Sequence, residues 1–374
     1  MAGPVRRYWR DDPLTGEPTL KTKRWRWRRF WLYLLVPVVV VALIVTAWTW
    51  WAEENPQKER ELRVQLHEEL QQRFPEHMTL PESRRGFVPR TGDRDADRPP
   101  DVILIHGLDE PGDIWDDLVP VLDAAGIHAW EFRYPNDQAV DRSTDLLADY
   151  WRELPADHDV VLIGHSMGGL VIRDFVSRWR HPADGDPAVD GARVHGTVLV
   201  GTPNHGSEWA RLRVWLGLRE FFASIPDDDF SLFASLQEGT GAAKIDLRPG
   251  SEFLTDLNAR PWPEEVPVRI IGGVLGGPDP DVIGGISSIA AELDAEDWPR
   301  DFESWWFGLG EELGDGVVPV DSLSLAGAPP PAMVSASHRG LLSRTLISDE
   351  EPPAIPLIMD LLAEWQVVEE EADG

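Results

Sequence analysis

The chain has 374 residues, a formal net charge of −30 from 35 basic and 65 acidic side chains, and no cysteine. The absence of cysteine excludes disulfides, thiolate metal sites and a thiol nucleophile. The acidic balance argues against a nucleic-acid partner, because a negative surface repels phosphates. A hydrophobic content of 42% is enough, over this length, to bury a sizeable core.

The N-terminal part of the chain combines a basic tail with an apolar run. Residues 1–29 hold nine Arg or Lys against three acids, so the remainder carries −36. Residues 30–52 carry no charge and are long enough, at ~1.5 Å per residue, to cross a ~30 Å hydrocarbon core. Tryptophans flank both ends of the run, as is typical of membrane interfaces.

These features predict a single-pass membrane protein with a cytoplasmic tail at 1–29 and a transmembrane signal anchor at 30–52. By the positive-inside bias, the acidic remainder of the chain is exported, either to the periplasmic side of an inner membrane or to the cell surface. A cleaved signal peptide is the competing interpretation, because Val45, Thr46 and Ala47 form a small-residue cleavage site. The long basic region before the run favours the uncleaved anchor.

Residues 53–100 are expected to form a spacer helix followed by a linker. Leu62, Leu66, Leu70 and Phe74 recur at i, i+4 intervals, a narrow apolar stripe on a charged helix. Residues 75–100 are rich in Pro, Gly, Arg and Asp and show no periodicity, which favours a linker.

From residue 101 to about 366 the pattern alternates between strands and helices. Continuous apolar strands joined by amphipathic helices predict an α/β fold with a mostly parallel sheet covered on both faces. An acidic tail follows at 367–374. The strands are expected at Val102–Ile105, His128–Tyr134, Val160–Ile163, Val194–Val200, Val266–Ile271 and, more weakly, Ala332–Ser335, with early helices at 113–126, 143–154 and 169–179.

The most specific motif is Gly164-His165-Ser166-Met167-Gly168, which follows an apolar strand and opens a helical pattern. This strand–turn–helix context is that of a nucleophile elbow. The serine must lie in a strained turn, and the turn brings strand and helix so close that only glycine fits at its two ends. A plain glycine-rich turn is the structural alternative. Ser166 is the candidate nucleophile.

His106, Gly107 and Leu108 end the strand expected at 102–105. In this context, the loop supplies one backbone N–H to an oxyanion hole, and the residue after the nucleophile supplies the other. The candidate donors are therefore Leu108 and Met167, an assignment that rests on position alone. His106 is expected to order the loop and not to act as a base.

These motifs together resemble the α/β-hydrolases of the bacterial lipase and esterase type. The resemblance covers residues 101–365 and rests on HGL, GHSMGG, LVGTPNHGS at 199–207 and GDGVVPVDS at 314–322. The stretch DLRPGSEFLTDLN is also similar to one in lipases related to the enzymes that deacylate GPI-anchor inositol. The resemblance implies an α/β-hydrolase fold and a triad in the order Ser, acid, His.

Within this resemblance, Asp315 matches the acid of the DGVV motif and is the favoured triad acid. Asp321, six residues later, is the main alternative, and Asp279 and Asp281 stay open. His338 is the favoured base, because it is the only histidine after the candidate acids. A serine nucleophile needs such a base.

The other histidines considered have weaker claims. His165 occupies the variable position of the elbow, His205 lies in the PNHG turn, and His195 begins a strand. The histidines show no HExxH or paired spacing, so no metal site and no cofactor are expected.

Two insertions are expected around the site, a helical cap at about 207–260 and a second segment at about 278–313. Aromatic residues in the cap suit a lid over a lipid ester, and they suit packing on the core equally well. The aromatic residues concerned are Trp209, Trp215, Phe221, Phe222, Phe230 and Phe233 in the cap, and Trp298, Trp305 and Trp306 in the second segment.

The sequence thus predicts a membrane-anchored serine hydrolase that forms an acyl-enzyme on Ser166 from a lipid or another hydrophobic carboxylic ester. Two alternatives stay open. An acyltransferase would use the same triad and pass the acyl group to an alcohol. A non-enzymatic hydrolase-like protein would bind lipid or a partner through its aromatic surface.

Overall fold

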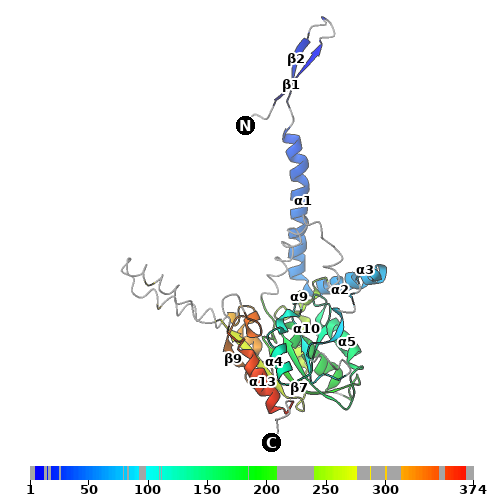
Figure 1. Ribbon diagram of the computed structural model, residues 1–374. Helices are drawn as coiled ribbons and strands as arrows, with labels where there is room; N and C mark the ends of the chain where they lie inside the picture. Colours follow the sequence, from blue (N-terminus) through cyan, green and yellow to red (C-terminus); the bar gives the residue numbers. More distant parts are fainter. Residues whose placement is uncertain are drawn as a thin grey trace. The chain divides into compact units, whose positions relative to one another are not determined.

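The computed structural model divides the chain into two compact units, Met1–Glu59 and Arg60–Gly374. Figure 1 shows their elements along the chain. The structure describes residues 5–11, 15, 18–24, 27–78, 80–81, 84–91, 98–108, 110, 112–183, 185–208, 240–275, 287, 300, 313–344 and 350–367.

The first unit contains a hairpin and a long helix. Strands β1 (Val5–Asp11) and β2 (Pro18–Arg24) pair antiparallel within the tail, where no strand was expected. Helix α1 spans Trp27–Glu54. Its stretch Leu35–Glu54 is, within the described part of the chain, long and apolar enough to cross a membrane, and 6% of it is buried. That low burial argues against a core helix, whereas length and composition fit an anchor and a signal sequence alike.

The second unit is built on a seven-stranded sheet in the order β3-β5-β4-β6-β7-β8-β9. Strand β3 runs antiparallel to β5, and the other neighbours pair in parallel. The mostly parallel sheet predicted by the alternating pattern is confirmed. The strands are β3 (Gly86–Pro89), β4 (Val102–Ile105), β5 (Ala129–Arg133), β6 (Asp159–His165), β7 (Arg193–Val200), β8 (Val268–Val274) and β9 (Ala332–Ser335).

Residues 75–100, expected to be a linker, contain helix α3 (Pro75–Met78) and strand β3. The sheet therefore begins earlier than residue 101, and the linker prediction was wrong for this part. Phe87 of β3 packs against Phe132 with ring centroids 5.6 Å apart. An edge strand of four residues is too short to give a clear period-two pattern, which explains why the sequence did not reveal it.

Helices cover both faces of the sheet. Neighbouring side chains of each strand point to opposite faces, and both sets are buried. In β4, Ile103 and Ile105 pack on one face, and Val102 and Leu104 pack on the other. The first face is covered by α5 (Val140–Trp151), α6 (Met167–Phe175) and α10 (Glu252–Ala259), and the second by α4 (Val119–Ala124) and α13 (Ala354–Glu364).

Helix α2 (Pro56–Arg73) forms where the spacer helix was predicted. Its apolar stripe does not provide the packing surface, because Leu62, Leu66 and Phe74 are exposed. From Arg60 onward, helix α2 belongs to the second unit. Two of its arginines, Arg60 and Arg63, contact other parts of that unit. Arg63 donates to the carbonyl of Thr240, and the Thr240 hydroxyl donates to the carbonyl of Arg63 at 2.6 Å.

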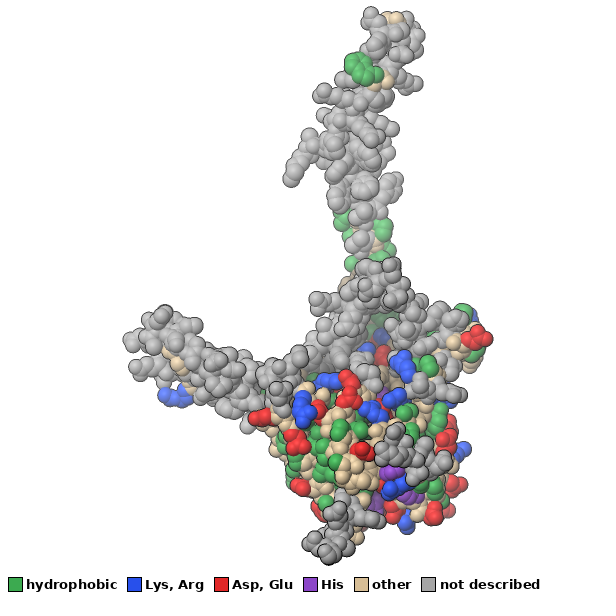
Figure 2. Space-filling view, viewed as in Figure 1, with side chains coloured by type: hydrophobic (Ala, Val, Ile, Leu, Met, Phe, Trp, Pro, Cys, Tyr) green, Lys and Arg blue, Asp and Glu red, His purple; other side chains and the backbone are tan. Residues whose placement is uncertain are grey.

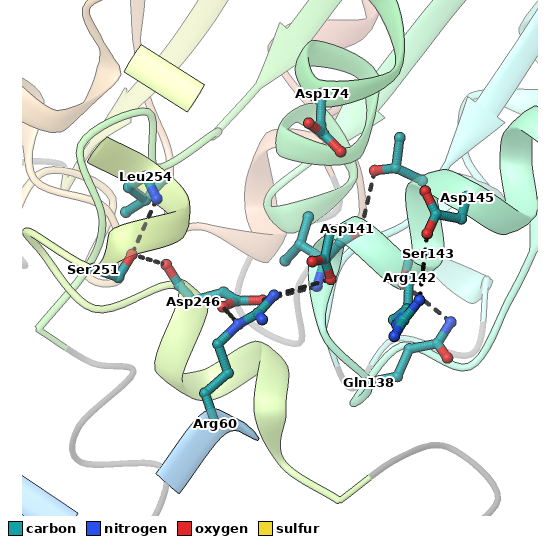
Figure 3. Close-up of polar contacts among 12 residues, drawn as sticks. Arg60, Gln138, Asp141, Arg142, Ser143, Asp145, Asp174, Asp246, Ser251 and Leu254 are labelled. Atoms are coloured by element: carbon teal, nitrogen blue, oxygen red, sulfur yellow. Dashed lines mark hydrogen bonds and ion pairs between the residues drawn. The ribbon is translucent and has the colours of Figure 1, made fainter. Parts of the chain in front are cut away.

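Arg60 of α2 contacts two carboxylates of this unit, as Figure 3 shows. Its Nε lies 2.5 Å from Oδ1 of Asp246, at the end of helix α9 (Ala242–Asp246), and its Nη2 lies 2.9 Å from Asp141 on α5. The buried Asp246 also accepts a hydrogen bond from the backbone N–H of Val140 at 2.9 Å. One guanidinium therefore joins α2, α5 and α9.

Charged side chains of both signs are spread over the face of the second unit seen in Figure 2. Acidic and basic groups lie there among apolar ones. On that face, the negative charge of the chain is thus interspersed with cations.

Candidate active site

Ser166 lies in the turn between β6 and α6, with φ 54° and ψ −126°. Among the described non-glycine residues, only Ser166 and Gln366 have a positive φ. Such a conformation is strained in an L residue and is the one that a nucleophile elbow requires. A Cβ on Gly168 would lie 2.0 Å from the carbonyl oxygen of Ile105, so the helix approaches β4 too closely for any other residue.

Asp315 and His338 contact each other directly. The Nδ1 of His338 lies 2.7 Å from Oδ2 of Asp315, and the backbone N–H of His338 donates to the Asp315 carbonyl at 2.9 Å. The other carboxylate oxygen accepts the N–H groups of Val317 at 2.9 Å and Val318 at 2.8 Å. The Asp315 side chain is 1% exposed, and the His338 side chain is 14% exposed. These contacts fix the orientation of the imidazole through its Nδ1 side.

Ser166 and His338 follow the carboxyl ends of β6 and β9. These strands are parallel, with parallel strands between them, so their carboxyl ends lie on the same side of the sheet. The N–H of Ser166 donates to the carbonyl of Val200 at 2.8 Å. The next residue, Gly201, lies against the His338 ring, since a Cβ on it would be 3.2 Å from Cε1. The structure therefore brings the nucleophile turn beside the Asp315–His338 pair.

Asp321, His195 and His205 have other surroundings. Asp321 lies exposed on the short helix Val320–Leu323. Asp279 and Asp281 lie outside the described residues. His195 contacts the carbonyl of Trp365 through Nε2 at 3.0 Å. His205 is exposed in its turn.

The two predicted oxyanion donors lie in the turn of Ser166 and in the loop after β4. Met167 is the first residue of α6, so its N–H has no acceptor within the helix. Leu108 belongs to the loop after β4, and a Cβ on the preceding Gly107 would lie 2.8 Å from Cβ of Ser166. The loop therefore passes directly beside Ser166, as an oxyanion hole requires.

His106 is held inside the protein at the start of this loop. Its ring stacks on Tyr134 with centroids 4.6 Å apart, and the Tyr134 hydroxyl donates to the His106 carbonyl at 2.6 Å. Burial raises the pKa of Tyr134, so the phenol keeps the proton that it donates. These contacts fit the expectation that His106 orders the loop.

A second acid–histidine pair, Glu110 and His165, contacts the first, and the sequence did not reveal it. Nδ1 of the buried His165 is 2.8 Å from Oε2 of Glu110, and its Nε2 is 3.1 Å from the carbonyl oxygen of His338. The rings of His165 and His338 have centroids 4.7 Å apart. The same Glu110 oxygen accepts the N–H of Gly107 at 3.0 Å.

The pKa values of this pair move in opposite directions. Burial disfavours the charged form of Glu110, but the charge of His165 and its hydrogen bond outweigh burial and lower the pKa of Glu110 to about 2. Burial also disfavours the charged form of His165, and the charge of Glu110 outweighs it and raises the pKa. Because 55 positions separate the two residues, no local spacing in the sequence signals the pair.

Several predicted features fall outside the described residues. They are the cap aromatics between 209 and 239 and the three tryptophans of the second insertion. The described end of the cap consists of α9 and α10. In the portion that the structure describes, no group of three or more His, Asp or Glu side chains could hold a metal ion.

Comparison with known proteins gives the family. The mature lipase BlEst2 of Bacillus licheniformis is 16% identical, with 74% of this chain and 97% of that chain covered and a TM-score of 0.45. The corresponding values are 12%, 74%, 97% and 0.47 for the Staphylococcus hyicus lipase, and 18%, 71%, 61% and 0.45 for the Legionella pneumophila phospholipase PlaB. No curated protein matches the chain. The profile of the alpha/beta hydrolase family matches residues 102–304, more than half of the sequence, and the chain therefore belongs to that family.

Proposed function

We propose that this protein is a serine hydrolase of carboxylic esters in which Ser166 is the nucleophile, His338 the general base and Asp315 the acid that orients it. The observation that carries the proposal is the 2.7 Å contact between His338 and Asp315 beside a serine in a strained turn. Family membership supports the same reaction class.

In the acylation step, the Ser166 hydroxyl attacks the ester carbonyl while Nε2 of His338 takes its proton. Asp315 accepts the Nδ1 hydrogen bond and stabilises the imidazolium without itself becoming protonated. The N–H groups of Leu108 and Met167 stabilise the negative oxygen of the tetrahedral intermediate. The imidazolium then protonates the leaving alcohol, and an acyl group remains on Ser166.

In the deacylation step, His338 removes a proton from water, and the resulting hydroxide attacks the acyl carbonyl. The same two N–H groups stabilise the second intermediate. Its collapse releases the carboxylic acid and returns the proton to Ser166. The positive end of α6 also faces the developing negative charge.

The substrate class is a hydrophobic, lipid-type ester presented near a membrane. Two features of the sequence support this part of the proposal: the aromatic-rich stretch expected to form a cap and the uncharged run at 30–52. We propose that this run anchors the protein with residues 1–29 in the cytoplasm. Full-length protein should resist extraction from membranes by alkaline carbonate and retain its N-terminus by mass spectrometry. Cleavage after Ala47 would contradict the anchor.

Replacement of Ser166 by alanine tests the enzymatic assignment. Ester hydrolysis and labelling by a fluorophosphonate should both disappear, with kcat falling ~10⁶-fold as for removal of a triad serine. Ser324→Ala is the matched control, because Ser324 is exposed and its hydroxyl only donates to the Asp321 carbonyl at 3.2 Å. Labelling that persists in the Ser166 variant would overturn the proposal.

The same preparation defines the substrate. A series of esters with increasing acyl length should show rising kcat/KM if the acyl site is apolar. Product analysis with a competing alcohol separates hydrolysis from acyl transfer, since transfer yields a new ester in place of the free acid.

A further inference from the structure

The two ring nitrogens of His165 each face an acceptor. Nδ1 faces the Glu110 carboxylate at 2.8 Å, and Nε2 faces the carbonyl oxygen of His338 at 3.1 Å. A carbonyl cannot donate, and an ionised carboxylate is an acceptor only. Oε2 of Glu110 also accepts from the N–H of Gly107, as an oxygen of an ionised carboxylate does. With Glu110 ionised, both His165 contacts are hydrogen bonds only if both nitrogens carry a proton, which makes His165 an imidazolium. The opposite pKa shifts of Glu110 and His165 agree with this charge state.

The pair joins two parts of the proposed active site. Oε2 of Glu110 accepts from Gly107, the residue before the proposed oxyanion donor Leu108. His165 then donates to the backbone of His338, whose N–H is bound to Asp315 at 2.9 Å. One carboxylate thus connects the oxyanion loop after β4 to the loop that carries the base after β9. Asn136 holds Glu110 from the other side, donating to its carbonyl at 3.3 Å.

The charges of the pair suit a base that becomes positive during the reaction. The rings of His165 and His338 are 4.7 Å apart, so a lone charge on His165 would oppose protonation of His338. Glu110 compensates, because its negative charge acts on both rings. Among the residues that the structure describes, the charged or titratable groups that act on His165 are Glu110 from the loop after β4, His338 from the loop after β9, and Asp315 after β8.

We infer that Glu110 and His165 form a buried carboxylate–imidazolium pair that positions both His338 and the oxyanion loop. The inference rests on the proposed function, because the groups that it positions are those of the proposed serine hydrolase. In Glu110→Gln, the amide oxygen that keeps the Gly107 bond is the atom that also faces Nδ1, so a neutral His165 has one proton for two acceptors and one of the contacts is lost. The base and the oxyanion loop are then no longer held relative to each other.

Selective ¹⁵N-histidine NMR on the full-length protein in nanodiscs tests the charge state directly. At pH 7, both nitrogens of His165 should be protonated in the wild type, with the signal assigned through His165→Asn. In Glu110→Gln, His165 should show one protonated nitrogen, and in Glu110→Asp, which keeps the charge, it should stay an imidazolium. A wild-type His165 with a single protonated nitrogen would overturn the inference.

Kinetics of the same variants test the positioning role. Loss of alignment by about 1 Å lowers turnover about 100-fold, so kcat should fall by that factor in Glu110→Gln with KM unchanged, and Glu110→Asp should recover much of the loss. Glu265→Gln is the matched control, because Glu265 contacts His181 at 2.9 Å in an exposed pair. Wild-type kcat in a Glu110→Gln protein that has lost the imidazolium would also overturn the inference.

The two hypotheses fail in different ways. A wild-type protein that neither hydrolyses esters nor reacts with a fluorophosphonate overturns the proposed function, and the catalytic role of the pair with it. A protein that reacts normally while His165 is neutral overturns only the pair.

Discussion

Glu110 and Asp246 are both buried carboxylates with a cationic partner within hydrogen-bond distance, yet their pKa values lie on opposite sides of the ordinary range. Burial is the largest influence on each and by itself raises both values. Beside Glu110, the attraction of His165 outweighs burial, and the pKa is about 2. Beside Asp246, burial outweighs Arg60, and the pKa rises to about 6.

The difference lies in how each cation is shared. Arg60 contacts Asp141 at 2.9 Å as well as Asp246, and the charge of Asp141 further disfavours ionisation of Asp246 (Figure 3). His165 divides its nitrogens between one carboxylate and one neutral carbonyl. His165, which serves one carboxylate, therefore holds Glu110 ionised although it is buried, whereas Arg60, which is shared by two, does not offset the burial of Asp246.

Replacing Arg60 with methionine is expected to have the largest effect on stability, because it leaves Asp246 buried without its cation. Removal of one partner of a buried ion pair costs ~3–5 kcal/mol. The free energy of unfolding should fall by this amount at pH 8 and by less at pH 5, where Asp246 binds a proton. Urea unfolding at both pH values measures it. The double variant Arg60→Met/Asp246→Asn should recover most of the loss, and an equal loss at both pH values would contradict the assigned charge.

Replacing Glu110 with glutamine should remove the stabilisation that its lowered pKa supplies. In the wild type, this contribution is present above the ordinary pKa of 4.5 and is lost as the pH falls toward about 2, because the unfolded chain binds the proton first. The difference between these two pKa values corresponds to a free energy of unfolding on the order of 3 kcal/mol. Urea unfolding between pH 3 and pH 6 should therefore show a steep dependence in the wild type and a shallower one in Glu110→Gln.

The raised pKa of His165 describes the same pair from the alkaline side. Its contribution is present below the ordinary value of 6.5 and is lost as the pH rises through the folded-state pKa. The stability supplied by the pair should thus be greatest between about pH 4.5 and 6.5. If Glu110→Gln lowers the free energy of unfolding by the same amount at pH 3 and at pH 6, this pH window is wrong.

Replacing Asp141 with asparagine is expected to have the smallest effect, because its side chain is 38% exposed and such pairs contribute ~0–1 kcal/mol. It should nevertheless sharpen the comparison, since Arg60 would then serve Asp246 alone and lower its pKa. In the wild type, the unfolded chain loses the Asp246 proton near the ordinary pKa of 3.8, whereas the folded protein keeps it up to about pH 6. The free energy of unfolding therefore falls as the pH rises between these two values. That decline should become shallower in the variant, and an unchanged slope would count against the sharing of Arg60.

The features that sequence reasoning predicted are those set by neighbouring residues. The elbow around Ser166 needs a strand, a strained turn and a helix in immediate succession, and the structure has them. Strand β9 has the predicted bounds because its apolar residues are contiguous. The contact of Asp315 with His338 follows from chain order in the family, as the two residues are 23 positions apart.

The features that it missed depend on distant contacts. Glu110 and His165 are 55 positions apart, and Arg60 and Asp246 are 186 positions apart. A buried charge is recognisable only when its partner is known, because an isolated Glu or Arg in a sequence is typical of a solvated surface. Strand β3 escaped for a related reason, since its four residues are defined by pairing with β5.

The position of β9 at the end of the strand order has a consequence for how the enzyme loses activity on heating. Ser166 follows β6, which pairs with a strand on each side, whereas His338 follows four residues that pair with β8 alone. Segments with few contacts open at lower free energy than the centre of a sheet. We therefore expect His338, the proposed base, to separate from Ser166, the proposed nucleophile, before the sheet melts, so that thermal inactivation begins as a local and reversible event at the edge of the fold.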